Sequence, residues 1–214
     1  MTLKYRLLFG PLAAVILGLG VTGLAVLIPG YSHVHQTVSE IGEIGSPARV
    51  PFAIMLGCVA ACILVFAWAV REVSVEDQRS QLAAYLIGFM ALPAAGIGVF
   101  AYPHPLHNVF GMSELIGYQA PLVLALTWRR DAGTKTLVVL SWIFSALIWG
   151  AIVLNLSPFV KSVWVYVKPF HGLAQRGLFA AWFGWCAVVG VLLSQRTRKI
   201  GREVNHSSRD FLNL

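Results

Sequence analysis

The chain has 214 residues, of which 57% are hydrophobic and only 12% are charged, and its mean hydropathy is +0.74. A soluble domain usually carries about twice that charged fraction, so the composition excludes an ordinary soluble protein and indicates a membrane protein. The formal net charge is +7. Because no nucleic-acid-binding motif accompanies this charge, we expect no nucleic-acid partner. The three cysteines do not make a disulfide framework.

Six apolar stretches are long enough to cross a hydrocarbon core of roughly 30 Å as helices. The first follows Lys4 and Arg6, and we interpret it as a retained span rather than a cleaved signal peptide. The six spans are expected at about residues 7–28, 50–70, 82–102, 105–128, 136–156 and 171–193. Pro93 is expected to kink the third span. The predicted fold class is all-α: a polytopic bundle of six transmembrane helices in one domain, residues 1–193, followed by a basic tail, residues 194–214.

Positive charge is distributed unevenly between the two ends of this predicted bundle. An even number of spans puts both termini on one side, and that side carries Lys4, Arg6, Arg71, Arg79, Arg129, Arg130, Lys135, Arg196, Arg198, Lys199, Arg202 and Arg209. The opposite side has only Arg49, Lys161, Lys168 and Arg176. The positive-inside rule therefore places both termini in the cytoplasm, with the protein in the cell membrane. Membrane lipids are its expected partners, and the basic tail is attracted to their anionic headgroups.

A polar cluster is expected at the extracytoplasmic end of the spans. Five of the six histidines fall on this side, and the cluster comprises His33, His35, Ser39, Glu40, Glu43, His104, His107, His171 and Arg176. Its centre is the stretch 101–118, where prolines separate the third span from the fourth and where His107 and Glu114 share one helix face, two turns apart.

The sharpest interpretation of the histidines is a metal site. Zinc takes imidazole nitrogen and carboxylate oxygen, and His104, His107 and His171, with His35 or Glu40, would supply enough ligands. Copper and iron suit imidazole almost equally well. A haem held between His107 and His171 is a second interpretation. In the alternative, these histidines are interfacial residues that water and lipid headgroups satisfy.

Other residues of the cluster suggest further roles. Glu114 and Arg176 both lie inside predicted spans, and an ion pair between them would relieve the cost of burying two charges. Such a pair would fix helix packing or, with Arg176 holding a lipid phosphate, bind a substrate headgroup. Ser39 beside Glu40 and His35 could suggest a nucleophile with a base, but a Ser-Glu pair in a turn is common as a helix cap, and we favour Ser39 as a cap. Asn155 would join the cluster or cap the fifth span.

Several short motifs resemble one family of membrane proteins. They are Tyr31-Ser32 followed by Ser39-Glu40-Ile41-Gly42, the Tyr102-Pro103 step, His107-Asn108-Val109-Phe110-Gly111, and Gln175-Arg176-Gly177. The chain resembles the bacterial and archaeal six-span proteins called domain of unknown function nine-nine-eight, and in layout it is distantly similar to the Frag1/DRAM/Sfk1 proteins. In that family an aspartate often follows the aromatic–proline step at the position that Pro105 holds here. The resemblance implies the six-span topology and points to Ser39, His107 and Arg176, without supplying a reaction.

Three classes of function follow from these patterns. The first is a metal-dependent hydrolase or transferase that acts on a lipid or lipid-linked substrate at the outer leaflet. In it the histidines bind metal, Glu40 or Glu114 acts as base with Ser39 nearby, and Arg176, Gln175 and Asn108 hold the substrate. The second is a small transporter or proton relay, which the apolar inner halves of the spans disfavour. The third is a non-catalytic membrane partner protein.

Overall fold

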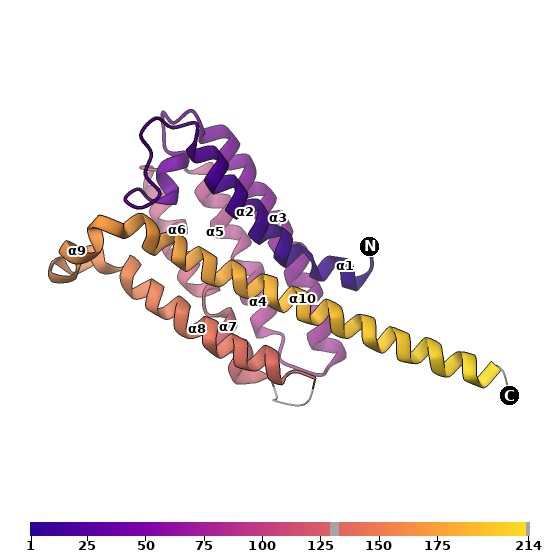
Figure 1. Ribbon diagram of the computed structural model, residues 1–214. Helices are drawn as coiled ribbons and strands as arrows, with labels where there is room; N and C mark the ends of the chain where they lie inside the picture. Colours follow the sequence, from indigo (N-terminus) through magenta and orange to yellow (C-terminus); the bar gives the residue numbers. More distant parts are fainter. Residues whose placement is uncertain (129–132, 213–214) are drawn as a thin grey trace.

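The computed structural model describes residues 1–128 and 133–212, with side chains described as far as residue 197. Across these residues the chain forms helices and no strand (Figure 1). The helices are α1 (Leu3–Leu7), α2 (Phe9–Ala25), η1 (Val38–Gly42), α3 (Arg49–Glu76), α4 (Leu82–Phe89), α5 (Ala91–Val99), α6 (Pro105–Gly117), α7 (Ala120–Thr127), α8 (Lys135–Asn155), η2 (Ser157–Phe159), α9 (Lys161–Val167), η3 (Lys168–Phe170) and α10 (His171–Leu212). Arg129, Arg130 and the basic side chains after residue 197 lie outside the described part.

Six of these helical segments are long and apolar enough to cross a membrane. They are Leu3–Ala25, Arg49–Glu76, Leu82–Val99, Pro105–Thr127, Lys135–Phe159 and Lys161–Thr197. The protein is therefore an all-α, multi-pass membrane-type bundle, as the composition predicted. The last helix does not end where the apolar run ends: α10 continues beyond Leu193 into the basic segment.

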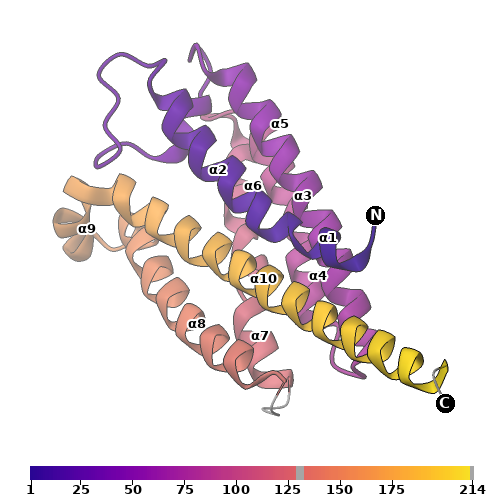
Figure 2. The ribbon, with the colours of Figure 1, turned by 45° about the vertical axis from the view of Figure 1, so that its right-hand side comes forward.

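The spans pack as a ring in chain order, which we call the helix ring. Each span contacts the next one along the chain: α2 packs on α3, α3 on α4 and α5, α5 on α6, α4 on α7, and α7 on α8. The ring closes because α10 packs on both α8 and α2, and Figure 2 shows α10 passing between them. This arrangement leaves room for a cavity at the centre.

Three spans are each divided into two helices by a proline. A proline has no N–H for the carbonyl four residues earlier, and its ring clashes with that carbonyl. The first helix of each divided span ends four residues before a proline, and these pairs are Leu7 and Pro11, Phe89 and Pro93, and Gly117 and Pro121. In the third span, where a kink is expected at Pro93, the helix is interrupted at Met90. The carbonyl of Gly117 is not left unpaired, because the buried Trp182 side chain donates its indole N–H to it at 3.1 Å.

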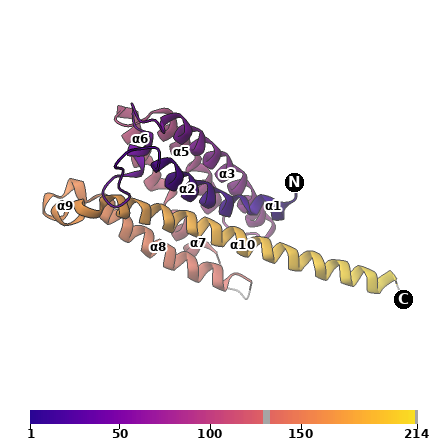
Figure 3. The same cartoon turned by 45° about the horizontal axis from the view of Figure 1, so that its top comes forward.

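Ion pairs tie the two ends of the chain to the same end of the ring. Arg6 donates to both carboxylate oxygens of Glu72, at 2.7 and 2.8 Å, and Arg196 donates to Asp77. The opposite end, which we call the loop end, is formed by residues 26–48, 100–104 and 156–170. Figure 3 shows α9 there, far from both termini. The cluster expected from the sequence lies at this loop end.

Candidate functional site

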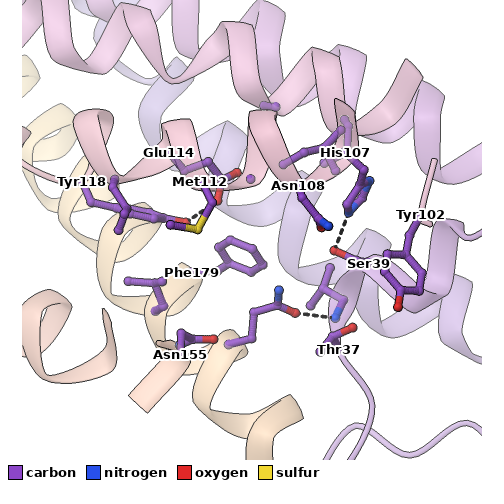
Figure 4. Close-up of a pocket in the computed structure, with 18 of the residues that line it drawn as sticks. Thr37, Ser39, Tyr102, His107, Asn108, Met112, Glu114, Tyr118, Asn155 and Phe179 are labelled. Atoms are coloured by element: carbon purple, nitrogen blue, oxygen red, sulfur yellow. Dashed lines mark hydrogen bonds between the residues drawn. The ribbon is translucent and has the colours of Figure 1, made fainter. Parts of the chain in front are cut away.

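A cavity of about 650 Å³ lies inside the helix ring and extends to the loop end. Every span contributes to its wall. The polar lining residues are Thr37, Ser39, Glu40, Glu43, Tyr102, His107, Asn108, Glu114, Tyr118, Asn155, His171 and Gln175. The rest of the wall is mainly aliphatic and aromatic, with Phe52, Leu56, Met90, Leu115, Leu178, Phe179 and Phe183 among its members. Figure 4 shows polar side chains around this space from η1, α6 and α8, among them Ser39, His107 and Asn155. An apolar cavity with a few convergent polar groups is the usual form of a ligand site.

The short helix η1 places Ser39 at the cavity, and its cap is Thr37. Glu40 accepts hydrogen bonds from the N–H and the hydroxyl of Thr37, both at 2.8 Å, and the Thr37 side chain in turn binds the Glu40 backbone. This reciprocal arrangement is a capping box. The prediction that Ser39 caps the turn is therefore wrong, because Thr37 takes that role. Glu40 is engaged in positioning η1, and the Ser39 hydroxyl is free for another partner.

That partner is His107, in the first turn of α6. The Ser39 Oγ lies 3.0 Å from Nε2 of His107, and Nδ1 of the same ring lies 2.8 Å from the Phe100 carbonyl oxygen. A carbonyl oxygen can only accept, so Nδ1 carries the proton and, in the neutral ring, Nε2 presents its lone pair to the serine hydroxyl. The imidazole is buried, and the Tyr102 ring packs edge-on against it. The Ser39–His107 dyad thus has the geometry of a nucleophile and its base.

The start of α6 fixes the position of His107. His104 is the N-cap residue, and its Nδ1 accepts a hydrogen bond from the Leu106 N–H at 3.2 Å. Pro105 occupies the first helical position, where its missing N–H costs nothing. His104 is exposed to solvent and engaged as a cap. It serves the site by fixing where α6 begins.

Arg176 fastens the 31–37 loop to α10. Its Nη1 donates to the carbonyl oxygens of His33, Gln36 and Gly172 at 2.8–2.9 Å, and its Nη2 donates to the Tyr31 hydroxyl at 2.6 Å. Tyr31 in turn donates to the Thr37 carbonyl at 2.6 Å. Burial raises the pKa of the Tyr31 phenol, and the adjacent guanidinium partly opposes this effect, so Tyr31 remains a donor.

The expected ion pair between Glu114 and Arg176 does not form. The guanidinium of Arg176 is turned to the loop, whereas Glu114 accepts a hydrogen bond from the Tyr118 hydroxyl at 2.7 Å. Among the described residues Glu114 has no salt-bridge partner. Tyr118 follows Glu114 by one helical turn, so the two side chains share a face and meet directly.

Gln175 and Asn108 both line the cavity but differ in how they are used. Gln175 accepts a hydrogen bond from the Val38 N–H at 2.6 Å, which joins α10 to η1. Asn108 follows His107 on α6, and its side chain has no hydrogen-bond partner among those described. Figure 4 shows it pointing into the cavity beside the Ser39–His107 dyad. Asn155 also reaches the cavity wall, and its amide N–H groups donate to the carbonyls of Ala151 and Ala174.

With this geometry in place, the chain can be compared with known proteins. The model of a family described as Protein of unknown function (DUF998) matches residues 11–192. The chain belongs to this family. The resemblance expected from the short motifs is thereby confirmed. Neither the curated proteins nor the solved structures include a match to the chain.

The DUF998 chain does not assemble the predicted metal ligands. His104 caps α6, His107 is held between Ser39 and Phe100, and His35 is hydrogen-bonded through Nδ1 to the Pro169 carbonyl. His171 lies against the Trp164 ring instead. No three His, Cys, Asp or Glu side chains among residues 1–128 and 133–197 group in a way that could hold a metal ion. These residues therefore do not fit zinc, and because both nitrogens of His107 are engaged, the pair His107 and His171 does not fit a haem.

The sequence reasoning missed several partners in the DUF998 site. The Thr-x-x-Glu spacing of Thr37 and Glu40 is a capping-box signature and would have identified the true cap. The four-residue spacing of Glu114 and Tyr118 on one helix would have suggested their contact. Nothing in the sequence marks Tyr31 as the partner of Arg176 or Phe100 as the carbonyl that orients His107, because both contacts depend on how separate segments fold together.

Proposed function

We propose that this DUF998 protein is a membrane-embedded serine hydrolase or acyltransferase that acts on a lipid ester. The observation that carries the proposal is the 3.0 Å contact between Ser39 Oγ and His107 Nε2 at the wall of a largely apolar cavity. A serine hydroxyl is a weak nucleophile unless an adjacent base accepts its proton. The neutral imidazole, oriented by the Phe100 carbonyl, is such a base.

The reaction follows from these two side chains. Ser39 Oγ attacks the carbonyl carbon of the ester while its proton moves to Nε2 of His107. Collapse of the tetrahedral intermediate breaks the bond to the ester oxygen, and His107 returns the proton to the departing alcohol. The acyl group is then bonded to Ser39. Water or a second alcohol then attacks the carbonyl carbon of this acyl-serine and gives its proton to His107. The bond between the acyl group and Ser39 Oγ breaks, His107 returns the proton to the serine oxygen, and the acyl group leaves as a free acid or a new ester.

The surrounding residues support the same chemistry. Asn108 lies beside the dyad, its amide N–H groups have no partner among the described hydrogen bonds, and it is suited to stabilise the oxyanion of the intermediate. The aliphatic and aromatic wall is suited to an acyl chain. A carbonyl rather than a carboxylate faces Nδ1. It fixes the tautomer without adding negative charge, so we expect less stabilisation of the imidazolium than a triad aspartate gives.

The proposed reaction needs no metal step, which changes the mechanism expected from the histidine pattern. Glu40 and Arg176 become positioning residues in this proposal, because each is engaged in holding the loop that carries Ser39. The charge distribution supports placing the loop end at the extracytoplasmic face, where an outer-leaflet lipid would enter. The alternative functions are a transporter and a non-catalytic partner protein. A negative result in the labelling experiment would favour them.

The test is covalent labelling of the purified full-length protein with a lipophilic fluorophosphonate probe. We expect labelling of Ser39, its loss in Ser39→Ala, and a decrease of about 10²-fold or more in rate in His107→Gln, since the base is removed. Ser113→Ala is the matched control: its hydroxyl, on the same helix as His107, donates to the Phe110 carbonyl and should not react. A chelator should leave labelling unchanged.

Two outcomes would contradict the proposal. One is the absence of labelling in the unmodified protein under conditions where it is folded. The other is labelling that persists at another residue in Ser39→Ala. Either would move the transporter and partner interpretations to the front.

A further inference from the structure

The cavity contains a second polar position that the mechanism above does not use. Glu114 follows His107 by seven residues on α6, which places its backbone about 10 Å further along the helix axis, away from the loop end. The hydroxyl of Tyr118 donates to its Oε2 at 2.7 Å. Both side chains line the same cavity as Ser39. We call Glu114 and Tyr118 the inner polar pair.

The inner polar pair is incomplete as a set of hydrogen bonds. Oε2 of Glu114 is engaged with Tyr118, while Oε1 has no hydrogen-bond or ion-pair partner among the described residues. The nearby indole of Trp182 cannot serve, because it is committed to the Gly117 carbonyl. Oε1 is not fully buried, in contrast to the unpaired side-chain atoms that are completely enclosed by protein. It therefore borders the open space of the cavity. A polar atom in such a position is available to a ligand.

Much of the cavity wall that the inner polar pair shares is apolar. Met90, Leu115, Phe179 and Phe183 line the cavity together with Glu114. A saturated acyl chain lying here would remove water from Oε1 and give no hydrogen bond in return, which is unfavourable for a carboxyl group. A chain that carries its own polar group at this depth would restore the lost hydrogen bond.

We propose that the inner polar pair binds a hydroxyl group on the substrate's chain, about 10 Å from the scissile carbonyl. The substrate class is then a hydroxylated acyl lipid. The statement that its ester is cleaved rests on the proposed function, whereas the statement that its hydroxyl group binds here does not. A hydroxyl both donates and accepts, so it pairs with Oε1 whether the carboxyl group is ionised or protonated. An ammonium group would fit only the ionised carboxylate and would carry its desolvation cost into the cavity.

The test measures equilibrium binding to full-length Ser39→Ala in detergent, so that no turnover is needed. The probes are methyl 10-hydroxyoctadecanoate, its 3-hydroxy isomer, methyl 10-aminooctadecanoate and methyl octadecanoate, and the signal is tryptophan fluorescence, because Trp182 packs edge-on against Tyr118. We expect the 10-hydroxy ester to bind about tenfold or more tightly than the unsubstituted ester, as one hydrogen bond to a carboxyl group provides. The 3-hydroxy isomer should show little of this gain.

Further variants show which residues cause the preference for the 10-hydroxy ester. Adding Glu114→Leu to Ser39→Ala should make the 10-hydroxy and unsubstituted esters bind equally, and adding Tyr118→Phe should reduce the preference. Glu43→Gln is the matched control, because Glu43 is another carboxylate of the cavity wall, near the loop end, and its loss should leave the preference intact. If Glu114→Leu does not fold, the comparison of the two hydroxyl positions in Ser39→Ala decides.

The results separate this inference from the proposed function. Equal binding of the four esters to Ser39→Ala, a preference that survives Glu114→Leu, or tightest binding of the amino ester would overturn the hydroxyl site. None of these results depends on reactivity at Ser39. Failure of the fluorophosphonate to label Ser39 would overturn the hydrolase and leave a measured hydroxyl preference in place.

Discussion

The Ser39–His107 contact joins the short helix η1 to α6 through one hydrogen bond. On one side, the capping box of Thr37 and Glu40 sets the orientation of η1. On the other, the Phe100 carbonyl sets the imidazole tautomer. Each member of the dyad is therefore oriented by its own segment before the two meet, which is the preorganisation that a reactive pair requires.

The inner polar pair makes a residue-scale prediction about stability. Tyr118→Phe removes the only described partner of the Glu114 carboxyl and should lower the free energy of unfolding by about 1 kcal/mol, because that group keeps some access to the cavity. Adding Glu114→Leu should recover part of the loss, since both polar partners are then replaced by apolar groups. Thermal unfolding in detergent of the unmodified protein, the two single variants and the double variant measures the coupling energy between the two side chains. Strictly additive losses would show that the two side chains do not interact.

At the scale of elements, Arg176 is the link between the loop end and α10. Gly172, one turn earlier, allows this contact, because a Cβ there would overlap the Gln36, His33 and Val34 carbonyl oxygens. The loop therefore lies directly on the helix backbone at Gly172 and is fastened by the guanidinium next to it.

Replacing Arg176 with methionine should release this loop. We expect the free energy of unfolding to fall by about 3 kcal/mol, because several charge-assisted hydrogen bonds to partly buried carbonyls are lost. Hydrogen exchange of the backbone amides of residues 31–42 should become faster, and fluorophosphonate labelling of Ser39 should slow. Arg71→Met is the control, since Arg71 contacts only the exposed Tyr85 hydroxyl among the described hydrogen bonds. Unchanged exchange in Arg176→Met would show that other contacts hold the loop.

The proline break between α6 and α7 gives a second prediction for an element. Trp182→Phe leaves the Gly117 carbonyl buried without a donor and should cost about 1–2 kcal/mol beyond the loss of volume. Trp185→Phe is matched in size and burial, but its partner is the Ser141 hydroxyl, which can turn to a carbonyl of its own helix. Thermal unfolding should therefore show a larger loss of stability for Trp182→Phe than for Trp185→Phe. Equal losses of stability would assign the effect to packing alone.

At the scale of the whole molecule, the charges predict the orientation in the membrane, with both termini in the cytoplasm. An impermeant maleimide should label Lys161→Cys in intact cells, and Glu76→Cys only after permeabilisation, with the three native cysteines replaced by alanine. Both positions are exposed, and they lie at opposite ends of the helix ring. The reverse pattern of labelling would place the loop end, and the dyad with it, in the cytoplasm.

How much of the molecule the sequence predicts depends on the range of the interactions. Hydropathy is a local property, so the six spans and the family follow directly from the residues. Ser39, His107 and Glu114 are recognisable as polar groups in an apolar chain, but their partners are not. The dyad joins residues 68 positions apart, and the bond between Arg176 and Tyr31 spans 145 positions. Such contacts exist only after the helix ring closes, which the charge and histidine patterns do not specify.

The attachment of the loop to α10 also has a consequence for biosynthesis. Ser39 is synthesised well before Arg176, Gln175 and Gly172, which hold its segment in place, and Gln175 follows its partner Val38 by 137 residues. Until α10 is in place, η1 lacks this support and the hydroxyl has no fixed approach to His107. In the proposed hydrolase, the nascent chain would therefore stay latent toward the surrounding bilayer until α10 has inserted and packed on η1.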